Sequence, residues 1–361
     1  MKKILYIITS IKRSGPNMVL ENMIKGINHK QYETYVLSFC EDDEKEKAQL
    51  EALGAKCYNC NFKNKLSILF LGVPKVKKIL KNMKPDIIHS HGIIPDYINS
   101  KIKHNNKITT LHCNINVDYY YAYGKRKSIL LTKFHKYCLN KLHNVICCSS
   151  SVYNEMKNTK LNNLSYIRNG IGSSQSKKKY NIRKELGIKK NDIVYLYTGA
   201  LIPRKNIVYL VKTMKDNLKE NEHFIILGDG IYFDEIKKYN SHNIHVLGFQ
   251  KNVDKYLDIA NVYVSASKME GLSISVIEAL DRELYLFLSD IESHKEFFSI
   301  DKNQYIGEIF NESNFSKQLE KLRKEIVKKQ KNTTASQFKS MYLSEKTMMK
   351  GYAKFYEKKE N

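Results

Sequence analysis

The sequence predicts an α/β protein with two doubly wound, Rossmann-like parallel sheets in tandem and a helical segment at the C-terminus. Three observations predict this fold class. Short apolar strands alternate with amphipathic helices from the N-terminus onward. The alternation stops at the polar stretch GSSQSKKK (172–179) and then begins again. The length of 361 residues also suits two domains better than one.

The first half contains short apolar runs of the kind that lie in parallel sheets buried on both faces. Strands are expected at Lys3–Thr9, Thr34–Phe39, Asp86–His89, Lys107–His112 and Asn144–Cys148. Helices are expected at Met18–Ile27 and Asp42–Leu53, where apolar residues recur at helical spacing. The alternation places ligands at the carboxyl ends of these strands.

The second half repeats the same alternation. Strands are expected at Ile193–Thr198, Phe224–Leu227, Ile244–Leu247, Val262–Ser265 and Tyr285–Leu288. From Ser316 to the end the apolar spacing is helical. We therefore expect a first domain over 1–172, a second over 173–340, and a helix over 341–361 that packs back on the first domain.

Composition excludes several classes of protein. An apolar share of 42% and a charged share of 27% are ordinary for a globular chain and exclude a largely disordered one. No apolar run approaches the roughly 18–20 residues that span a bilayer. The N-terminal apolar run is too short for a signal peptide. Seven cysteines without framework spacing indicate a reduced, cytoplasmic protein.

The positive charge is distributed unevenly along the chain. Residues 1–172 carry 28 Lys and Arg against 12 Asp and Glu, a net of +16, whereas residues 173–316 carry 20 of each. Such a field favours an anionic partner, which is either a phospholipid surface, a diphosphate-linked substrate or nucleic acid. A genome rich in Lys codons is the alternative explanation, although it does not account for the neutral middle.

Two turns place candidate phosphate-binding groups after strands. Gly15, in the turn Lys12–Asn17, opens a helix and lets backbone N–H groups approach a phosphate, although the local sequence alone favours an ordinary turn. Arg204 and Lys205 follow the first strand of the second half, where Arg grips a diphosphate bidentately and Lys acts as a point charge.

The segment Met269–Ala279 gives the strongest signal. Glu270 follows a strand, and a helix is expected to begin near Leu272–Ser273. The N–H groups of Gly271 through Ser275 then point toward a diphosphate. Glu278 lies two turns into the helix, where a carboxylate accepts both hydroxyls of a ribose.

Together these stretches resemble a GT-B fold glycosyltransferase, and those of the second half resemble glycosyltransferase family 4, the large retaining family. The matching stretches occur in family order and cover nearly the whole chain. They are Pro85–Gly92, Thr110–His112, Ile167–Ile171, Pro203–Asn206, Gly228–Gly230 and Glu270–Glu278. In such enzymes two Rossmann-like domains face a cleft, the second binding the nucleotide sugar and the first the acceptor.

The resemblance implies a role for each site residue. Lys205 and Arg204 would clamp the donor diphosphate with Gly271, Leu272 and Ser273, and Glu278 would hold the ribose. Glu270 would hold hydroxyls of the donor sugar, His112 would lie by the reaction centre, and Gly15 would face the diphosphate. No metal or other cofactor is implied, because the cations and the helix end supply the charge that a metal would.

Two departures from the family pattern stand out. Ala200 follows Gly199 where the family commonly has Gly-Arg, and we expect Arg204 to supply the missing charge. The run Leu280–Tyr285 replaces a Gly-containing turn and a Pro. Both departures leave open a catalytically inactive GT-B subunit that stabilises another transferase. A nucleic-acid binder is disfavoured because no recognition motif accompanies the charge, and an epimerase of the same fold has no support beyond the fold.

Three further features allow more than one interpretation. The apolar run Leu66–Val73 and the Lys-rich stretch after it predict an amphipathic helix, which either docks on a membrane or packs normally. Tyr119–Tyr123, followed by basic residues, is interpreted as an acceptor loop in preference to a nucleic-acid surface. Cys57 and Cys60 lack a second ligand pair, which disfavours a zinc site.

The sequence therefore predicts a metal-independent, retaining glycosyltransferase of polysaccharide biosynthesis, such as capsule. We expect a nucleotide-sugar donor, UDP-linked, and a lipid-linked glycan or polysaccharide acceptor. We expect the protein to lie in the cytoplasm, peripheral on the inner face of the cell membrane and attached to its anionic surface, without nucleic acid as a partner.

Overall fold

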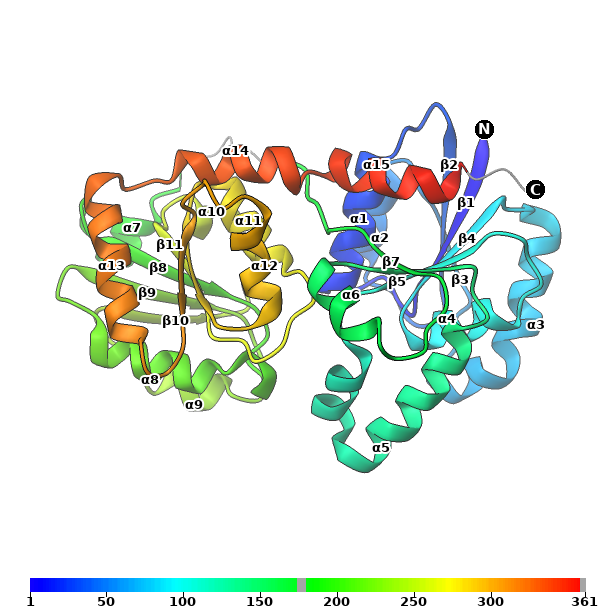
Figure 1. Cartoon of the computed structure of the whole chain (residues 1–361), viewed down its shortest axis with the longest axis horizontal. Coiled ribbons are helices and arrows are strands. Elements are labelled where there is room, and N and C mark those ends of the chain that lie inside the picture. Colours follow the sequence, from blue (N-terminus) through cyan, green and yellow to red (C-terminus); the bar gives the residue numbers. More distant parts are fainter. Residues whose placement is uncertain (174–179, 358–361) are drawn as a thin grey trace. The chain divides into compact units, whose positions relative to one another are not determined.

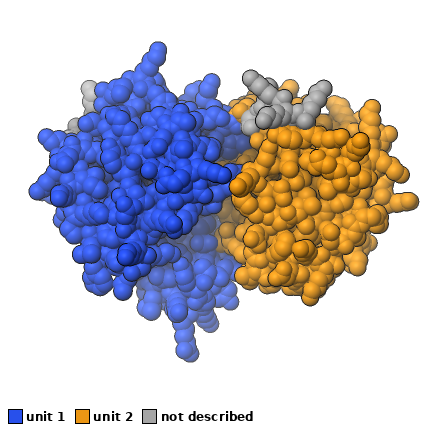
Figure 2. Space-filling view, turned by 180° about the vertical axis from the view of Figure 1, so that it is seen from behind, with its two compact units in different colours: residues 1–172, 344–361 blue, residues 173–343 orange. Residues whose placement is uncertain are grey.

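The computed structural model describes residues 1–173 and 180–357. The chain forms two compact units, shown in different colours in Figure 2. Unit 1 comprises residues 1–172 and 344–361, and unit 2 comprises residues 173–343. Most of the polar stretch expected as an interdomain linker, 174–179, lies outside the described residues.

Among the described residues of unit 1, seven parallel strands form one sheet in the order β3-β2-β1-β4-β5-β6-β7. Figure 1 shows the strands of this unit in blue to green. In chain order these strands are β1 (Lys2–Ile7), β2 (Tyr32–Ser38), β3 (Lys56–Asn59), β4 (Ile87–His91), β5 (Lys107–Leu111), β6 (Asn144–Cys147) and β7 (Leu164–Tyr166). The central strands β1, β4 and β5 are almost wholly buried, as their apolar sequences require.

Helices connect these strands. They are α1 (Gly15–Gly26), α2 (Glu44–Ala52), α3 (Lys65–Met83), α4 (Ile93–Lys101), α5 (Ile115–Leu139) and α6 (Ser150–Met156). Helix α1 begins three residues earlier than expected, because Ser14 caps its first turn and Pro16 fits there. Residues Tyr119–Tyr123, expected as a loop, lie inside α5, which is interrupted at Gly124.

Unit 2 repeats this plan with a six-stranded parallel sheet among its described residues, in the order β10-β9-β8-β11-β12-β13. Its strands are β8 (Ile193–Thr198), β9 (Glu222–Leu227), β10 (Ile244–Gly248), β11 (Val262–Ser265), β12 (Tyr285–Ser289) and β13 (Gly307–Phe310). Its helical elements are α7 (Ile182–Glu185), η1 (Pro203–Lys205), α8 (Ile207–Asn217), α9 (Phe233–Lys237), α10 (Asp254–Leu257), α11 (Ile274–Asp281), α12 (Glu292–Ile300), α13 (Phe315–Lys328) and α14 (Thr333–Tyr342). Two parallel sheets flanked by helices confirm the predicted fold class.

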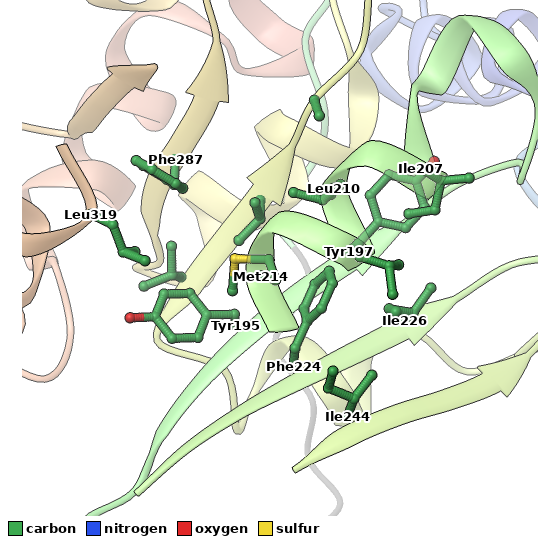
Figure 3. Packing of buried hydrophobic residues seen from close by; sticks show 14 of the residues in the cluster. Tyr195, Tyr197, Ile207, Leu210, Met214, Phe224, Ile226, Ile244, Phe287 and Leu319 are labelled. Carbon is green, nitrogen blue, oxygen red and sulfur yellow. The ribbon is translucent and has the colours of Figure 1, made fainter. Parts of the chain in front are cut away.

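The core of unit 2 lies where α8 and α13 cover the sheet. Figure 3 shows Tyr195, Phe224 and Met214 packed against one another, and every one of these side chains is fully buried. Each such side chain contributes about 1.5–3 kcal/mol when it is removed from water. The core therefore holds rigid the strands whose ends carry the polar side chains described below.

The last helix, α15 (Glu345–Tyr356), belongs to unit 1 and packs on α1. A backbone bridge pairs Ile171 with Ser344 at the point where the chain returns to this unit. Gly170 and Gly26 allow the close approach, because a Cβ at either position would lie within 3 Å of backbone atoms of Ser344 or Glu345.

The edge strands β3, β7 and β13 were absent from the sequence prediction. Strands β3 and β7 are half-exposed and lack a continuous apolar run, which is the signal used to find the buried strands. Among the described residues, no helix combines the length and the apolar character needed to cross a membrane.

Candidate active site

The polar groups of unit 2 gather at the carboxyl edge of its sheet. Strands β8 and β11 are neighbours at the point where the strand order reverses. In open α/β sheets, ligands bind at the crevice outside the strand ends at such a point. Lys205 follows β8 and Glu270 follows β11, so the topology brings together residues that lie 65 positions apart.

Glu270 is the centre of this cluster. Its Oε1 accepts hydrogen bonds from Nζ of Lys205 and, at 2.7 Å, from Oγ of Ser267. Its Oε2 lies 3.6 Å from a guanidinium nitrogen of Arg204. The two loops are also joined directly, because the backbone N–H of Lys268 donates to the carbonyl of Arg204 at 2.8 Å. The structure thus brings together Arg204, Lys205 and Glu270.

The electrostatics of the cluster favour a charged carboxylate. Burial by itself raises the pKa of Glu270, but the charges of Lys205 and Arg204 and the hydrogen bonds from Lys205 and Ser267 outweigh it and lower the pKa to about 2. Glu270 is therefore ionised at neutral pH, and it neutralises cations that would otherwise repel each other.

Helix α11 begins beside this cluster, at Ile274 with Ser273 as its N-cap, one to two residues later than expected. Its first intrahelical bond runs from Ile277 N–H to the Ser273 carbonyl, and the side chain of Ser273 makes no capping hydrogen bond. The N–H groups before Ile277 are thus oriented for an anion. Gly271 and Leu272, in the loop before the helix, are buried.

Glu278 lies on the half-exposed face of α11 together with Ser275, whereas the other side of this helix is apolar and buried. The positions three apart place both side chains on one face. The charge of Glu278 also contributes to the raised pKa of Tyr263 on β11, which is mainly due to burial. Glu278 thus lies on the same side of the sheet edge as the Tyr263 hydroxyl.

The turn Gly228–Gly230 gives the Lys205 loop its shape. A Cβ on Gly228 would lie 1.8 Å from the carbonyl oxygen of Gly199, and one on Gly230 would lie 2.6 Å from that of Leu201. The Leu201 N–H donates to the Asp229 carbonyl at 2.8 Å. Only glycine allows this backbone approach.

Sequence reasoning missed His294, which is fully buried in α12. Its Nδ1 lies 3.0 Å from the carbonyl oxygen of Ser289, and Oγ of Ser289 donates to the Ser267 carbonyl at 2.7 Å. His294 thus connects to Glu270 through Ser289 and Ser267. Burial lowers its pKa to about 4. The feature of the sequence that could have identified His294 is its position, five residues beyond the end of β12.

The two departures from the family pattern have structural explanations. Arg204 brings a cation to Glu270, and its replacement of the family's Arg at position 200 stays a prediction. In the run that replaces the Gly-containing turn, Glu283 itself adopts a left-handed conformation with φ of 61°. Asp281 forms a buried ion pair with Lys339 at 2.9 Å. Residues 280–285 therefore still form a turn, and the ion pair joins α11 to α14.

The polar groups of unit 1 also lie at a reversal of strand order, between β1 and β4. Gly15 lies beyond β1 at the first turn of α1, and an added Cβ there would meet nothing within 4 Å. The Asn17 amide donates to the carbonyls of Ser10 at 2.8 Å and Lys12 at 2.7 Å, which fixes the loop before it.

Three histidines form a stacked row beside this point. His89 and His91 on β4 have ring centroids 4.6 Å apart, and His91 and His112 have centroids 5.2 Å apart. His91 Nδ1 lies 2.9 Å from His112 Nε2. Burial lowers the pKa of His89 to about 3 and that of His112 to about 4. All three rings are therefore neutral at physiological pH.

Helix α15 fixes the buried end of this row. The Tyr356 hydroxyl lies 2.7 Å from His89 Nδ1, and Thr110 Oγ1 lies 2.8 Å from His89 Nε2. The Tyr352 hydroxyl in turn lies 2.8 Å from Thr110 Oγ1. Both His89 nitrogens are thus engaged, and the ring has one orientation.

A second polar cluster in unit 1 was also missed. His135 on α5 lies between the Tyr119 hydroxyl, at 2.6 Å from its Nδ1, and Asp96 on α4, at 2.7 Å from its Nε2. Thr109 donates to the same carboxylate at 2.6 Å. This buried network fastens α5 to α4 and β5. Within the described residues, no group of three or more His, Cys, Asp or Glu side chains has the arrangement of a metal site.

Family models match both halves of the chain. The family model Glycosyltransferase Family 4 matches residues 13–175, and Glycosyl transferases group 1 matches residues 178–338. The Escherichia coli O-antigen biosynthesis glycosyltransferase WclY is 28% identical over 313 residues, 82% of each chain. The UDP-Gal:alpha-D-GlcNAc-diphosphoundecaprenol alpha-1,3-galactosyltransferase of Escherichia coli is 26% identical over 258 residues, 64% of this chain and 63% of the relative.

Among solved structures, Anabaena Alr3699/HepE in complex with UDP-glucose superposes with a TM-score of 0.80 at 16% identity, over 98% of this chain and 99% of that one. At 16% identity this similarity shows the fold alone. The two family models together cover nearly the whole chain. The chain belongs to the GT-B glycosyltransferases of the family 4 group.

Proposed function

We propose that this glycosyltransferase moves a sugar, with retention, from a UDP-linked donor to a lipid-linked or surface polysaccharide acceptor. The observation that carries the proposal is the cluster of Arg204, Lys205 and Glu270 at the strand-order reversal of unit 2. A nucleotide sugar combines a diphosphate with hydroxyl groups, and this cluster offers cations for the first and a carboxylate for the second.

In this proposal the diphosphate binds to Lys205, Arg204 and the N-terminus of α11, near Gly271, Leu272 and Ser273. Glu278 accepts the ribose hydroxyls, and Glu270 accepts hydroxyls of the donor sugar. His112 and Gly15 contribute from unit 1. The cations and the helix end stabilise the departing charge, so no metal ion is required for this role.

The proposed transfer needs no nucleophile from the protein. The bond between the sugar's anomeric carbon and the diphosphate oxygen breaks as the acceptor oxygen bonds to that carbon on the same face. The acceptor hydroxyl proton passes to the departing diphosphate. The protein positions both partners and stabilises the diphosphate.

The choice of acceptor is supported by the relatives. One is named for O-antigen biosynthesis and another for galactosyl transfer to a diphosphoundecaprenol-linked sugar. A third relative, of Staphylococcus aureus, is named for capsular polysaccharide biosynthesis. A lipid-linked acceptor would place this protein on the inner face of the cell membrane.

A surface of unit 1 suits that location. We define the α3–α5 surface by exposed apolar side chains of α3 and of the part of α5 after Gly124, which are Leu66, Phe70, Leu71, Ile129, Leu130, Phe134 and Tyr137. Tyr97 on α4 joins the two helices, since its ring packs on Phe134 at 5.6 Å and its hydroxyl donates to the Leu69 carbonyl at 3.1 Å.

The charge around this surface has one sign. No Asp or Glu occurs in residues 52–85 or 119–154, the stretches that contain most of α3 and α5. Exposed lysines lie beside the apolar side chains, for example Lys65 and Lys133. Exposed apolar side chains whose charged neighbours in the sequence are cations suit an anionic lipid surface, where each Lys contributes on the order of 1 kcal/mol.

A two-stage experiment tests the proposed function. A thermal-shift screen with nucleotide sugars identifies the donor, because a bound ligand raises the apparent stability. Transfer from that donor to a diphosphate-lipid-linked sugar is then followed, and the anomeric configuration of the product is read by NMR. An absence of transfer from every nucleotide sugar would contradict the proposal, and an inverted product would contradict retention.

A further inference from the structure

The hydrogen bond between His91 and His112 constrains which nitrogen of His112 carries its hydrogen. His91 Nδ1 and His112 Nε2 are 2.9 Å apart, so one of them donates and the other accepts. This contact occupies Nε2 of His112. The ring's other nitrogen, Nδ1, is the one left to meet a ligand, and the His112 side chain is half-exposed.

Both rings are neutral, so each holds a single hydrogen. His91 is about 5% exposed, and burial holds its pKa well below the usual range. The neighbouring His89 and His112 oppose a second charge in the row. The pair therefore has two possible arrangements, which differ in the ring that donates.

The far nitrogen of His91 distinguishes them. Nε2 of His91 is buried and has no hydrogen-bond partner among the described residues. If His91 carried its hydrogen there, a buried N–H would have no acceptor, which is rare in proteins and costs about 1–3 kcal/mol. If the hydrogen is on Nδ1, that nitrogen donates to His112 and only a lone pair is left without a partner.

We infer that His91 is a positioning residue that donates from Nδ1 to Nε2 of His112, which leaves His112 as a neutral ring presenting an Nδ1–H. His112 then acts as a hydrogen-bond donor toward an oxygen of the donor sugar. It cannot take a proton through Nδ1 in this state, so it is no general base. The identity of the ligand rests on the proposed function. The position of the hydrogen on His112 is a property of the protein without a ligand.

The row behind His91 keeps its ring in place. His89 stacks on His91 with an interplanar angle of 21°, and Tyr356 and Thr110 occupy both nitrogens of His89. The ring of Tyr6 lies 6.2 Å from that of His91. The packing thus opposes a rotation of His91 that would exchange its two nitrogens.

The decisive measurement is long-range proton–nitrogen NMR of the full chain with ¹⁵N-labelled histidine, which distinguishes the two neutral forms of each ring. We assign the signals with the His112→Asn and His91→Asn variants. His112 is expected with its hydrogen on Nδ1, and a hydrogen on Nε2 would overturn the inference. This readout requires no sugar transfer, so it stands even where the proposed function fails.

A matched pair of variants tests the consequence. His91→Phe keeps a ring in the stack but removes the donor, and His91→Asn places an amide N–H where Nδ1 was. We expect His91→Phe to lower kcat by about tenfold or more with nucleotide affinity unchanged, as when a histidine is held in the wrong tautomer. His91→Asn is expected to restore part of the rate. Equal loss in both variants, or no change in the His112 signals of His91→Phe, would show a packing role only.

Discussion

Lys205 donates a hydrogen bond to Glu270, and both residues lie at the strand-order reversal where a donor diphosphate would arrive. Without a ligand, the cation of the proposed clamp and the carboxylate of the proposed sugar site thus neutralise each other. Arg204 approaches the same carboxylate from the other side. A diphosphate must therefore share these cations with Glu270, which has consequences for binding.

Lys205→Ala is expected to weaken binding of a nucleoside diphosphate by about 2–3 kcal/mol, the scale of a charge-assisted hydrogen bond. Glu270→Gln is expected to bind the nucleotide at least as tightly as the parent, because Lys205 and Arg204 are released from the carboxylate. Transfer should nevertheless be lost, because the sugar hydroxyls lose their acceptor. Calorimetry with nucleotide alone and turnover with nucleotide sugar measure the two effects.

Lys212→Ala, at an exposed position of α8, is the matched control and should bind the nucleotide like the parent. If Lys205→Ala and Glu270→Gln both bind like the parent and transfer normally, the donor site lies elsewhere.

Membrane attachment is expected to depend on the apolar side chains of the α3–α5 surface. Phe70 and Leu130 are 74% and 70% exposed, so replacing both by Ser leaves the core intact. Each substitution removes roughly 1.5–3 kcal/mol of the free energy gained when the side chain is buried in a lipid interface. The double variant should therefore bind vesicles of anionic lipid at least about tenfold more weakly. Liposome flotation at rising salt measures this.

Val327→Ser on α13 of unit 2 is the control, since Val327 is 81% exposed and lies far along the chain from this surface. Equal binding of all three proteins would contradict attachment through the α3–α5 surface, and equal binding to neutral and anionic vesicles would contradict an electrostatic contribution. Binding to neither kind of vesicle would remove the membrane from the list of partners.

The sequence allowed the central strands and the unit 2 cluster to be predicted because both depend on local patterns. Continuous apolar runs define β8 and β11, and residues just after them must lie at one edge of the sheet. The bond between Lys205 and Glu270 was not predicted, because side-chain pairing depends on loop shape. That shape depends on Gly228, whose approach to Gly199 is visible only in three dimensions.

The histidine row was harder to predict. His89 and His91 alternate along β4, a spacing that in sequence favours substrate-side or hydrogen-bonded histidines over a metal site. One of the two residues that engage His89 is Tyr356, 267 positions away on α15. A helical pattern near the C-terminus predicts α15, but it carries no information about which side chain reaches which strand. The prediction of a loop at Tyr119–Tyr123 was wrong. These residues lie in helix α5, which is interrupted at Gly124 and continues beyond it.

The hydroxyl of Tyr356 is expected to contribute to the stability of unit 1. Tyr356→Phe removes the partner of His89 Nδ1 in a fully buried site, and a buried polar group without a partner costs about 1–3 kcal/mol. Denaturant unfolding measures the difference. Tyr120→Phe, at an exposed position of α5, should change the stability by less than about 0.5 kcal/mol. Equal stability of both variants would show that His89 finds another partner.

His294 makes the stability of the protein depend on pH in the acid range. Its pKa falls from an ordinary 6.5 to about 4 because it is buried, so between these values the unfolded chain binds the proton that the folded chain excludes. Its contribution is fully present above pH 6.5 and is lost as the pH falls toward 4.

In His294→Asn the amide N–H can still donate to the Ser289 carbonyl but does not titrate, so the stability should fall less steeply, by up to about 1.4 kcal/mol per pH unit. Unfolding measured at steps from pH 7 to 4 tests this, with His29→Asn as an exposed control. A parallel decline in the parent and in His294→Asn would mean that the ring is protonated in the folded protein.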